Sequence, residues 1–193
     1  GPAGLPYQYP SSVASTSPGR VRRSARTPGA VPETLHEGGS PCGLAVIGTR
    51  VLWVDRGDPE LGLSNGTLQA HDGAVTTLVS DEPAPTSLIA DGTYLYWTRY
   101  GTQALGYTDG AVVRARHDGS EITLLASGDL KANALVQDDS HVYFAGPAHI
   151  YRVRKDGSGA LEPLTKAADA GGANDFDFVG LASDGTPLYW THY

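Results

Sequence analysis

The chain is poor in the residues that several protein classes require. It has one cysteine among 193 residues, which excludes an internal disulfide framework and a cysteine-rich zinc module. No apolar run approaches the ~18 residues of a membrane-spanning helix. Lysine and arginine number 14 against 21 aspartate and glutamate, a formal net charge of −7, which disfavours binding to duplex nucleic acid. We therefore expect neither a membrane span nor a nucleic-acid partner.

Glycine and proline, by contrast, are abundant. The 25 glycines and 13 prolines are spread along the chain and disfavour any long uninterrupted helix. Residues 1–18 are rich in Pro, Ser, Gly and Ala, a composition typical of a linker, and are predicted to form an N-terminal arm. For the remainder, residues 19–193, this composition favours short strands joined by turns.

A repeat organises residues 19–193. An aromatic residue preceded by an apolar one recurs about every 46 residues, and a leucine lies nine residues before each aromatic residue. The aromatic residues are Trp53, Trp97, Phe144 and Trp190, and the leucines are Leu44, Leu88, Leu135 and Leu181. Turn sequences such as Asp91-Gly92 separate the two, and Asp-Gly tolerates the positive φ of tight hairpins. Each repeat therefore contains a predicted β-hairpin whose leucine and aromatic residue belong to the core.

A second hairpin is predicted in each repeat. Its turns are Pro28-Gly29, Asp72-Gly73, Asp118-Gly119 and Asp156-Gly157. The sequence Val112-Val113-Arg114 leaves open which face of the third strand points inward. Four short antiparallel strands in each repeat are typical of a β-propeller blade. The predicted fold is all-β, a propeller of four blade-equivalents: complete blades near 43–80, 87–127 and 134–166, and terminal half-blades at 19–37 and 176–193.

Two segments carry a resemblance to a known family. Residues 94–100 (YLYWTRY) and 188–193 (LYWTHY), with turns such as ADGT and KDGS, resemble YWTD-type propeller repeats and the bacterial NHL and TolB-like six-bladed propellers. The resemblance covers roughly residues 19–193 and implies a propeller, a fold that serves binding, scaffolding and catalysis alike. The family's fourth motif position is aspartate only at Asp55, and Arg99, Gly146 and His192 replace it elsewhere. An aspartate-based link between blades is therefore implied for the first repeat alone.

The two half-blades complement each other. The N-terminal one supplies the second, outer hairpin of a blade, and the C-terminal one supplies the first, inner hairpin. The simplest prediction is that they pair into one composite blade and close a ring, which removes exposed sheet edges. The alternative is an open arc that is completed by a second copy or by another chain with more blades.

Uneven loop lengths mark one face of the predicted propeller. The connections at residues 55–66 and 99–110 are long, Gly146-Pro147-Ala148 is short, and an insertion lies at residues 167–175. Because loops on a rigid scaffold commonly carry binding, we predict that this face recognises a ligand or partner. The candidate residues are Asp55, Arg56, Asp58, Arg99, Tyr100, Tyr107, Asn174, Asp175 and His192.

Motifs for catalysis or metal binding are scarce. The six histidines show no H-E-x-x-H spacing, and the G-x-S-x-G match at residues 62–66 precedes a strand where a nucleophile elbow needs a helix. Asn174, Asp175 and Asp177 offer oxygen ligands for Ca²⁺, but three are too few for a calcium site. We therefore predict no catalytic residue and no cofactor, with Ca²⁺ as the alternative.

These features favour a non-catalytic binding or scaffolding propeller, an accessory subunit that recognises a protein or surface ligand through its loop face. The first alternative is a propeller enzyme, a lyase or a metal-dependent lactonase-like hydrolase, with its site at the axial channel. The second is a part of a longer propeller. The expected partner is a protein or a second copy of the chain, and the mild acidity suits an extracellular or bacterial envelope location.

Overall fold

The computed structural model describes residues 18–147, 149–165, 178–185 and 187–192. These residues form short strands and two 3-10 helices, η1 (Pro59–Leu61) and η2 (Gln103–Leu105). The strands make five antiparallel sheets, each formed by neighbours in sequence. None of the helices in the described part of the chain is long and apolar enough to cross a membrane.

Three of the sheets have four strands, and two at the ends have two strands. The N-terminal pair is β1 (Arg20–Arg23) and β2 (Glu33–Glu37). The first four-stranded sheet contains β3 (Pro41–Ile47), β4 (Arg50–Asp55), β5 (Gly66–His71) and β6 (Val75–Glu82). The second contains β7 (Pro85–Ala90), β8 (Tyr94–Arg99), β9 (Gly110–Arg116) and β10 (Thr123–Gly128). The third contains β11 (Leu135–Gln137), β12 (His141–Gly146), β13 (His149–Arg154) and β14 (Glu162–Pro163). The C-terminal pair is β15 (Phe178–Ser183) and β16 (Leu188–His192). This is the predicted propeller architecture of three complete blades and two half-blades.

The apolar core lies in layers between successive sheets. Leu52 and Val54 of β4 pack against Leu88 and Trp97 of the next sheet in one layer. In the following layer, Val112 of β9 belongs to the same cluster as Phe144 of β12. Trp97 and Phe144 are fully buried, and burying a side chain of this size stabilises the fold by roughly 1.5–3 kcal/mol. The prediction that the repeated apolar positions form the core is confirmed for these residues.

The third strand of the second blade, β9, is buried on both faces. Val113 belongs to the layer shared with the preceding sheet, whereas Val112 belongs to the layer shared with the following sheet. Both side chains are fully buried. This explains why the apolar pattern did not show which face points inward: both do.

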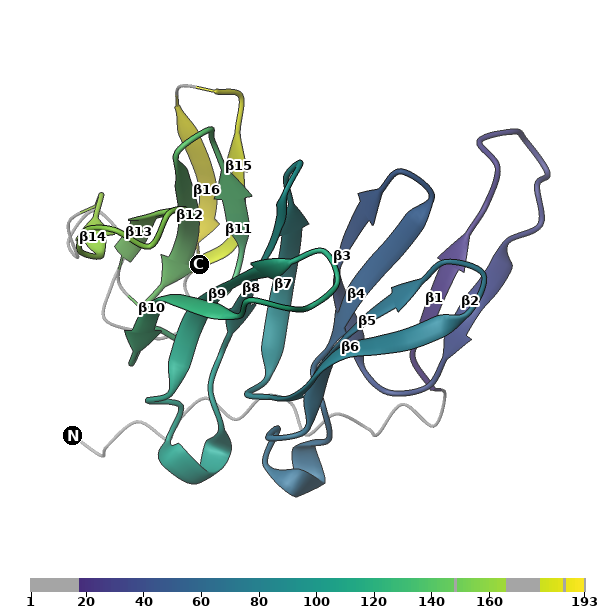
Figure 1. Ribbon diagram of the computed structural model, residues 1–193, viewed down its shortest axis with the longest axis horizontal. Helices are drawn as coiled ribbons and strands as arrows, with labels where there is room; N and C mark the ends of the chain where they lie inside the picture. Colours follow the sequence, from purple (N-terminus) through teal and green to yellow (C-terminus); the bar gives the residue numbers. More distant parts are fainter. Residues whose placement is uncertain (1–17, 148, 166–177, 186, 193) are drawn as a thin grey trace, which may run out of the picture.

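The two half-blades do not pair, so the prediction of a composite blade is wrong. Among the described residues, β1–β2 and β15–β16 are separate two-stranded sheets. Figure 1 shows them at opposite ends of an arc of sheets. Neighbouring sheets are held apart by the large side chains between them, which limits how far each blade turns relative to the last. Four blade-equivalents do not turn far enough to bring the ends together.

Two repeat positions near the ends depart from the predicted core. Leu44 of β3 is 53% exposed, although Leu88 at the same repeat position is 3% exposed. No inner strands of a preceding blade face Leu44 among the described residues, since β1–β2 supplies only the outer hairpin. Trp190 of β16 is 38% exposed. The preceding sheet ends in β14, which has two residues, and this short outer strand covers little of its neighbour.

Candidate interaction site on the loop face

Two successive blades carry connections of the same design between their second and third strands. The β4–β5 connection contains η1 and then Gly62 at φ 69°, and the β8–β9 connection contains η2 and then Gly106 at φ 61°. In the first, the Asn65 Oδ1 atom accepts a 2.8 Å hydrogen bond from the Asp58 amide. In the second, the Asp109 Oδ1 atom accepts one of 2.7 Å from the Thr102 amide. Left-handed glycines and matching side-chain hydrogen bonds give both loops a defined shape.

The two loops are also joined to each other. The Gln103 amide of the second loop donates a 3.1 Å hydrogen bond to the Gly62 carbonyl of the first. Leu61 and Leu105 occupy equivalent positions at the ends of η1 and η2, and each is 59% exposed. Figure 1 shows the two loops side by side at one end of their sheets. The result is one firm surface that presents two apolar side chains to solvent.

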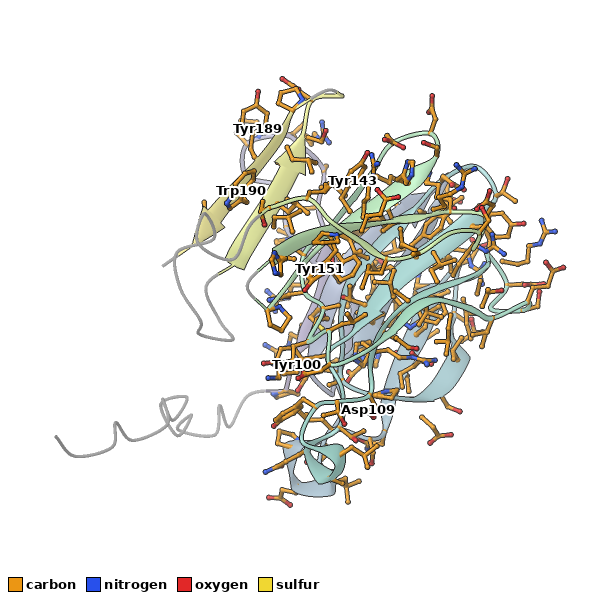
Figure 2. The ribbon with its side chains drawn as sticks, turned by 90° about the vertical axis from the view of Figure 1, so that its left-hand side faces the viewer. Tyr100, Asp109, Tyr143, Tyr151, Tyr189 and Trp190 are labelled. Atoms are coloured by element: carbon orange, nitrogen blue, oxygen red, sulfur yellow. The ribbon has the colours of Figure 1, made fainter. Side chains whose placement is uncertain are left out.

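A pair of tyrosines belongs to the second of these loops. The Tyr100 and Tyr107 rings meet edge to face with centroids 5.3 Å apart. The Arg56 guanidinium lies 5.7 Å from the Tyr100 ring centroid, within the range of a cation–π contact. Tyr100 itself is 7% exposed, so it supports the surface from below. Figure 2 shows Tyr100 at this end of the molecule, near Asp109. We call Arg56, Leu61, Tyr100, Leu105 and Tyr107 the loop-face patch.

Arg99, at the fourth motif position of the second repeat, is held in a buried ion pair. Its guanidinium donates two hydrogen bonds of 2.7 Å to Glu82, one to each carboxylate oxygen. The Trp97 indole N–H donates to the same carboxylate at 2.5 Å. The Glu82 residue is 1% exposed. Sequence reasoning missed Glu82, because nothing in the repeat pattern marks a glutamate at the end of an outer strand as the partner of a tryptophan two strands away.

Asp55, at the fourth motif position of the first repeat, makes different contacts. Its carboxylate accepts hydrogen bonds from the Ser40 amide at 2.9 Å and from the Gly57 amide at 3.0 Å. It therefore ties the end of β4 to the segment that leads into β3. The third repeat has Gly146 here, where a Cβ atom would come within 2.8 Å of the Leu130 carbonyl oxygen.

An open hollow of about 450 Å³ lies beside Asp55, between the end of β2 and the β4–β5 loop. Both the end of β2 and the β4–β5 loop contribute polar residues to its lining. The lining residues are His36, Gly38, Gly39, Ser40, Asp55, Gly57, Asp58, Pro59, Asn65, Thr67 and Gln69. Asp55 is 8% exposed, so the hollow reaches a carboxylate that is otherwise enclosed.

The predicted candidates whose side chains are described fall into three groups. Arg56, Tyr100 and Tyr107 lie together in the loop-face patch, and Asp55 and Asp58 line the hollow. Arg99 is engaged with Glu82. The other predicted candidates are Asn174 and Asp175, which lie outside the described residues, and His192, of which only the backbone in β16 is described. Within the described ranges, no group of three or more His, Cys, Asp and Glu is arranged to hold a metal ion.

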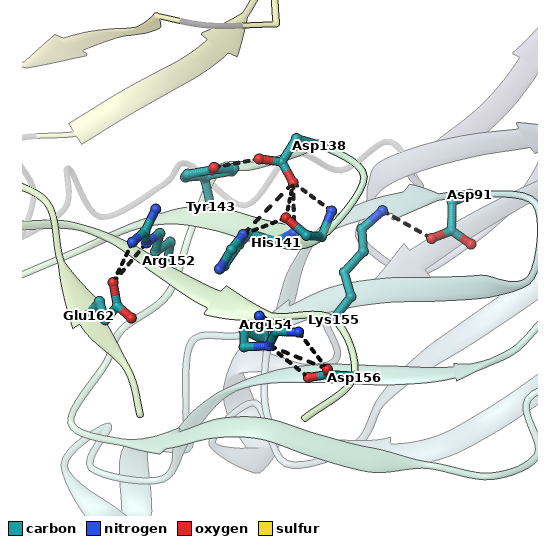
Figure 3. A network of polar contacts seen from close by, with 10 residues as sticks. Asp91, Asp138, His141, Tyr143, Arg152, Arg154, Lys155, Asp156 and Glu162 are labelled. Carbon is teal, nitrogen blue, oxygen red and sulfur yellow. Dashed lines mark hydrogen bonds and ion pairs between the residues drawn. The ribbon is translucent and has the colours of Figure 1, made fainter. Parts of the chain in front are cut away.

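The opposite end of the blades, where the hairpin turns lie, carries a polar network (Figure 3). The Lys155 ammonium reaches the Asp91 carboxylate of the preceding blade at 3.1 Å. Partial burial alone would raise the pKa of Asp91, but hydrogen bonds from the Thr93 and Tyr94 amides, the Tyr96 hydroxyl and Lys155 outweigh burial and lower this pKa to about 2. The network therefore ties the hairpin turns to their own blades and one blade to the next.

Comparisons with known proteins support the fold. No family model and no curated protein matches the chain. Among solved structures, the chain is similar to a protein in the crystal structure of a nidogen/laminin complex, with a TM-score of 0.65 and 20% identity over 85% of this chain and 60% of that one. It is also similar to TolB from Acinetobacter baumannii, with a TM-score of 0.56 and 18% identity over 84% of this chain and 40% of that one. The chain thus spans less than two thirds of these neighbours, and the likeness shows a β-propeller repeat fold.

Proposed function

We propose that this protein is a non-catalytic interaction propeller that recognises a protein partner through its loop-face patch. The observation that carries the proposal is the pair of equivalent leucines, Leu61 and Leu105, each 59% exposed on two loops that are hydrogen-bonded to each other. Exposing one leucine is ordinary, but presenting two on adjoining ordered loops brings apolar surface together. Arg and Tyr beside such surface are residues that interfaces favour.

The nature of the loops supports this function. Interface loops that are ordered before binding lose little conformational entropy when the partner arrives. Here the left-handed Gly62 and Gly106 and the hydrogen bond between Gln103 and Gly62 hold both loops in place. The fold neighbour in the nidogen/laminin complex is a protein-binding case on a similar scaffold, which is compatible with the proposal.

A comparison of variants tests the proposal. A Leu61→Ser/Leu105→Ser double variant removes the apolar pair, and a Val75→Ser/Ile122→Ser double variant removes two exposed apolar side chains elsewhere, which are 40% and 48% exposed. Wild type and both variants are immobilised, and proteins captured from the native source are quantified, after thermal unfolding confirms that all three are folded. We expect a protein that wild type and the control variant retain and the loop variant loses. Capture that is equal for all three contradicts the proposal.

We infer a second candidate function at the open end of the arc formed by β1 and β2. This end binds an additional β-hairpin of the repeat type. Leu44 and Val46 of β3 are 53% and 58% exposed there. Among the described residues, β1 pairs with β2 alone, so its other edge has no strand partner. A hairpin paired with β1 would cover both side chains and complete a blade. Such a hairpin comes from a second copy, through its β15–β16, or from further blades of a longer propeller.

Light scattering on the purified 20.2 kDa chain separates the two sources. A second copy predicts a concentration-dependent mass that a Leu44→Lys/Val46→Lys double variant returns to that of a monomer. A monomer at every concentration overturns the second-copy source and leaves further blades as the source.

The enzymatic alternative gains no support from the described residues, because Asp55, Arg99 and Gly146 do not form a common site. An extracellular or envelope location and a Ca²⁺ site stay predictions.

A further inference from the structure

The hollow beside Asp55 has a counterpart in the next repeat, and there it is filled. If a Cβ atom were added to Gly66, it would meet Pro85 and the Glu82 carbonyl oxygen; one added to Gly19 would meet Pro41 and the Gly39 carbonyl oxygen. Gly39 is therefore the first-repeat counterpart of Glu82. Likewise, Asp55 stands two residues after Trp53, as Arg99 stands two residues after Trp97. The buried Arg99–Glu82 pair of the second repeat is thus replaced by Asp55 and Gly39 in the first.

This replacement leaves an indole N–H without an acceptor. In the second repeat, Trp97 donates to Glu82. In the first repeat, Trp53 is 0% exposed, and its Nε1 atom has no hydrogen-bond partner among the described residues. Trp53 lies between two residues of the hollow: Gln69 is its neighbour in register on β5, and the His36 ring is 5.3 Å away. By the geometry of the second repeat, the Trp53 N–H is directed toward Gly39, which also lines the hollow. An unpaired buried donor of this kind destabilises the fold.

The hollow also has unused acceptors and negative charge. The buried Oε1 atom of Gln69 has no partner among the described residues. Asp55 and Asp58 both line the hollow, and neither takes part in an ion pair with another described residue. Asp55 accepts one backbone N–H at each oxygen, so each oxygen retains acceptor capacity. A ligand that fits must bring positive charge and several hydrogen-bond donors.

We propose that the hollow binds an arginine residue of the protein partner, whose guanidinium pairs with Asp55 and Asp58 in the place beside the unpaired Trp53. The pairing restores the arginine–carboxylate contact of the second repeat. Here, however, the carboxylate stands at the repeat position of Arg99, and the partner supplies the arginine. A guanidinium suits the site better than an ammonium, because its planar fork of five donors can serve two carboxylates together. The proposal rests on the proposed function and specifies the chemistry of the partner at the border of the loop-face patch.

An NMR titration of the full chain tests the proposal. The probe is N-acetyl-arginine N′-methylamide, which has the guanidinium and two backbone carbonyls, and the readout is the indole N–H resonance of Trp53, identified by its absence in Trp53→Phe. We expect a saturable shift of this resonance at millimolar probe, with the indole of Trp97 unmoved because Glu82 already accepts from it. The matching citrulline compound, which has the same shape without the charge, should bind at least tenfold more weakly.

Two charge variants complete the test. Asp58→Asn should lower the affinity for the probe about tenfold, because one charge-assisted contact is lost. Asp72→Asn removes the same charge from an exposed turn outside the hollow and should change nothing. The proposal is overturned if the Trp53 resonance does not move, if citrulline shifts it equally, or if both variants weaken the probe to the same extent. Because the probe replaces the partner, this result is independent of the capture experiment on Leu61 and Leu105.

Discussion

The Tyr96 hydroxyl donates a hydrogen bond of 2.9 Å to the Asp91 carboxylate, tying the turn of an inner hairpin to its second strand. The same contact recurs between Tyr143 and Asp138 at 2.6 Å. The first repeat has Ile47 at the aspartate position, and an apolar residue also replaces the tyrosine. The polar pair and the apolar pair are therefore alternative ways of closing the same hairpin.

The pKa of Asp91 makes this closure sensitive to acid. Because the folded-state pKa of about 2 lies below the ordinary 3.8, ionised Asp91 stabilises the fold fully above pH 3.8, and this stabilisation is lost as the pH falls toward 2. We expect the free energy of unfolding, measured by urea denaturation, to fall across this range in wild type and to fall less in Asp91→Asn. Asp72→Asn, a change at an exposed turn, serves as the control. Equal pH dependence in wild type and Asp91→Asn would contradict the assignment.

The buried Arg99–Glu82 pair should be costly to break from one side. Arg99→Met leaves the Glu82 carboxylate, 1% exposed, with the Trp97 N–H as its remaining side-chain donor, and we expect a loss of roughly 3–5 kcal/mol. Removing both charges in Arg99→Met/Glu82→Leu should recover much of that loss. Urea denaturation measures both free energies. A single variant as stable as wild type would show that the pair does not hold the second blade to the first.

The contribution of the repeat leucine to stability should depend on whether a neighbouring blade covers it. Leu88→Ala removes a side chain that is 3% exposed between two sheets, and we expect a loss of about 2–5 kcal/mol. Leu44→Ala changes the same repeat position where the side chain is 53% exposed, and the loss should stay below about 1 kcal/mol. Both are measured by chemical denaturation of dilute protein. Equal losses would mean that Leu44 is covered in solution.

Gly66 is required at the point where β5 meets the next blade. A Cβ atom there would lie 2.4 Å from Pro85 Cδ and 2.6 Å from the Glu82 carbonyl oxygen, so Gly66→Ala must push backbone apart. We expect a loss of about 2 kcal/mol or more, as for other overpacked positions. Gly92→Ala is the matched control, because nothing lies within 4 Å of its added Cβ atom. A thermal shift confined to Gly66→Ala is the expected result, and similar shifts in both would refute this role.

The sequence by itself determined the local structure and the repeat. Turns such as Asp91-Gly92 and the regular spacing of Leu88 and Trp97 predict hairpins and blades, because local turn chemistry and alternation decide them. The long loops also predicted where Arg56, Tyr100 and Tyr107 come together, since equivalent connections of neighbouring blades leave a propeller on the same face.

Only the tertiary structure decided how the repeats differ from one another. Nothing in the sequence marks Glu82, at the end of a strand, or Gly39, in a loop. Only the packing of one blade on the next brings Glu82 beside Trp97 and leaves Gly39 beside an unpaired Trp53. Whether the half-blades meet depends on the small rotation between sheets, summed along the arc, which no local pattern encodes. For the same reason Leu44 and Leu88, identical within the repeat, differ in exposure: burial is a property of the neighbouring blade and not of the residue.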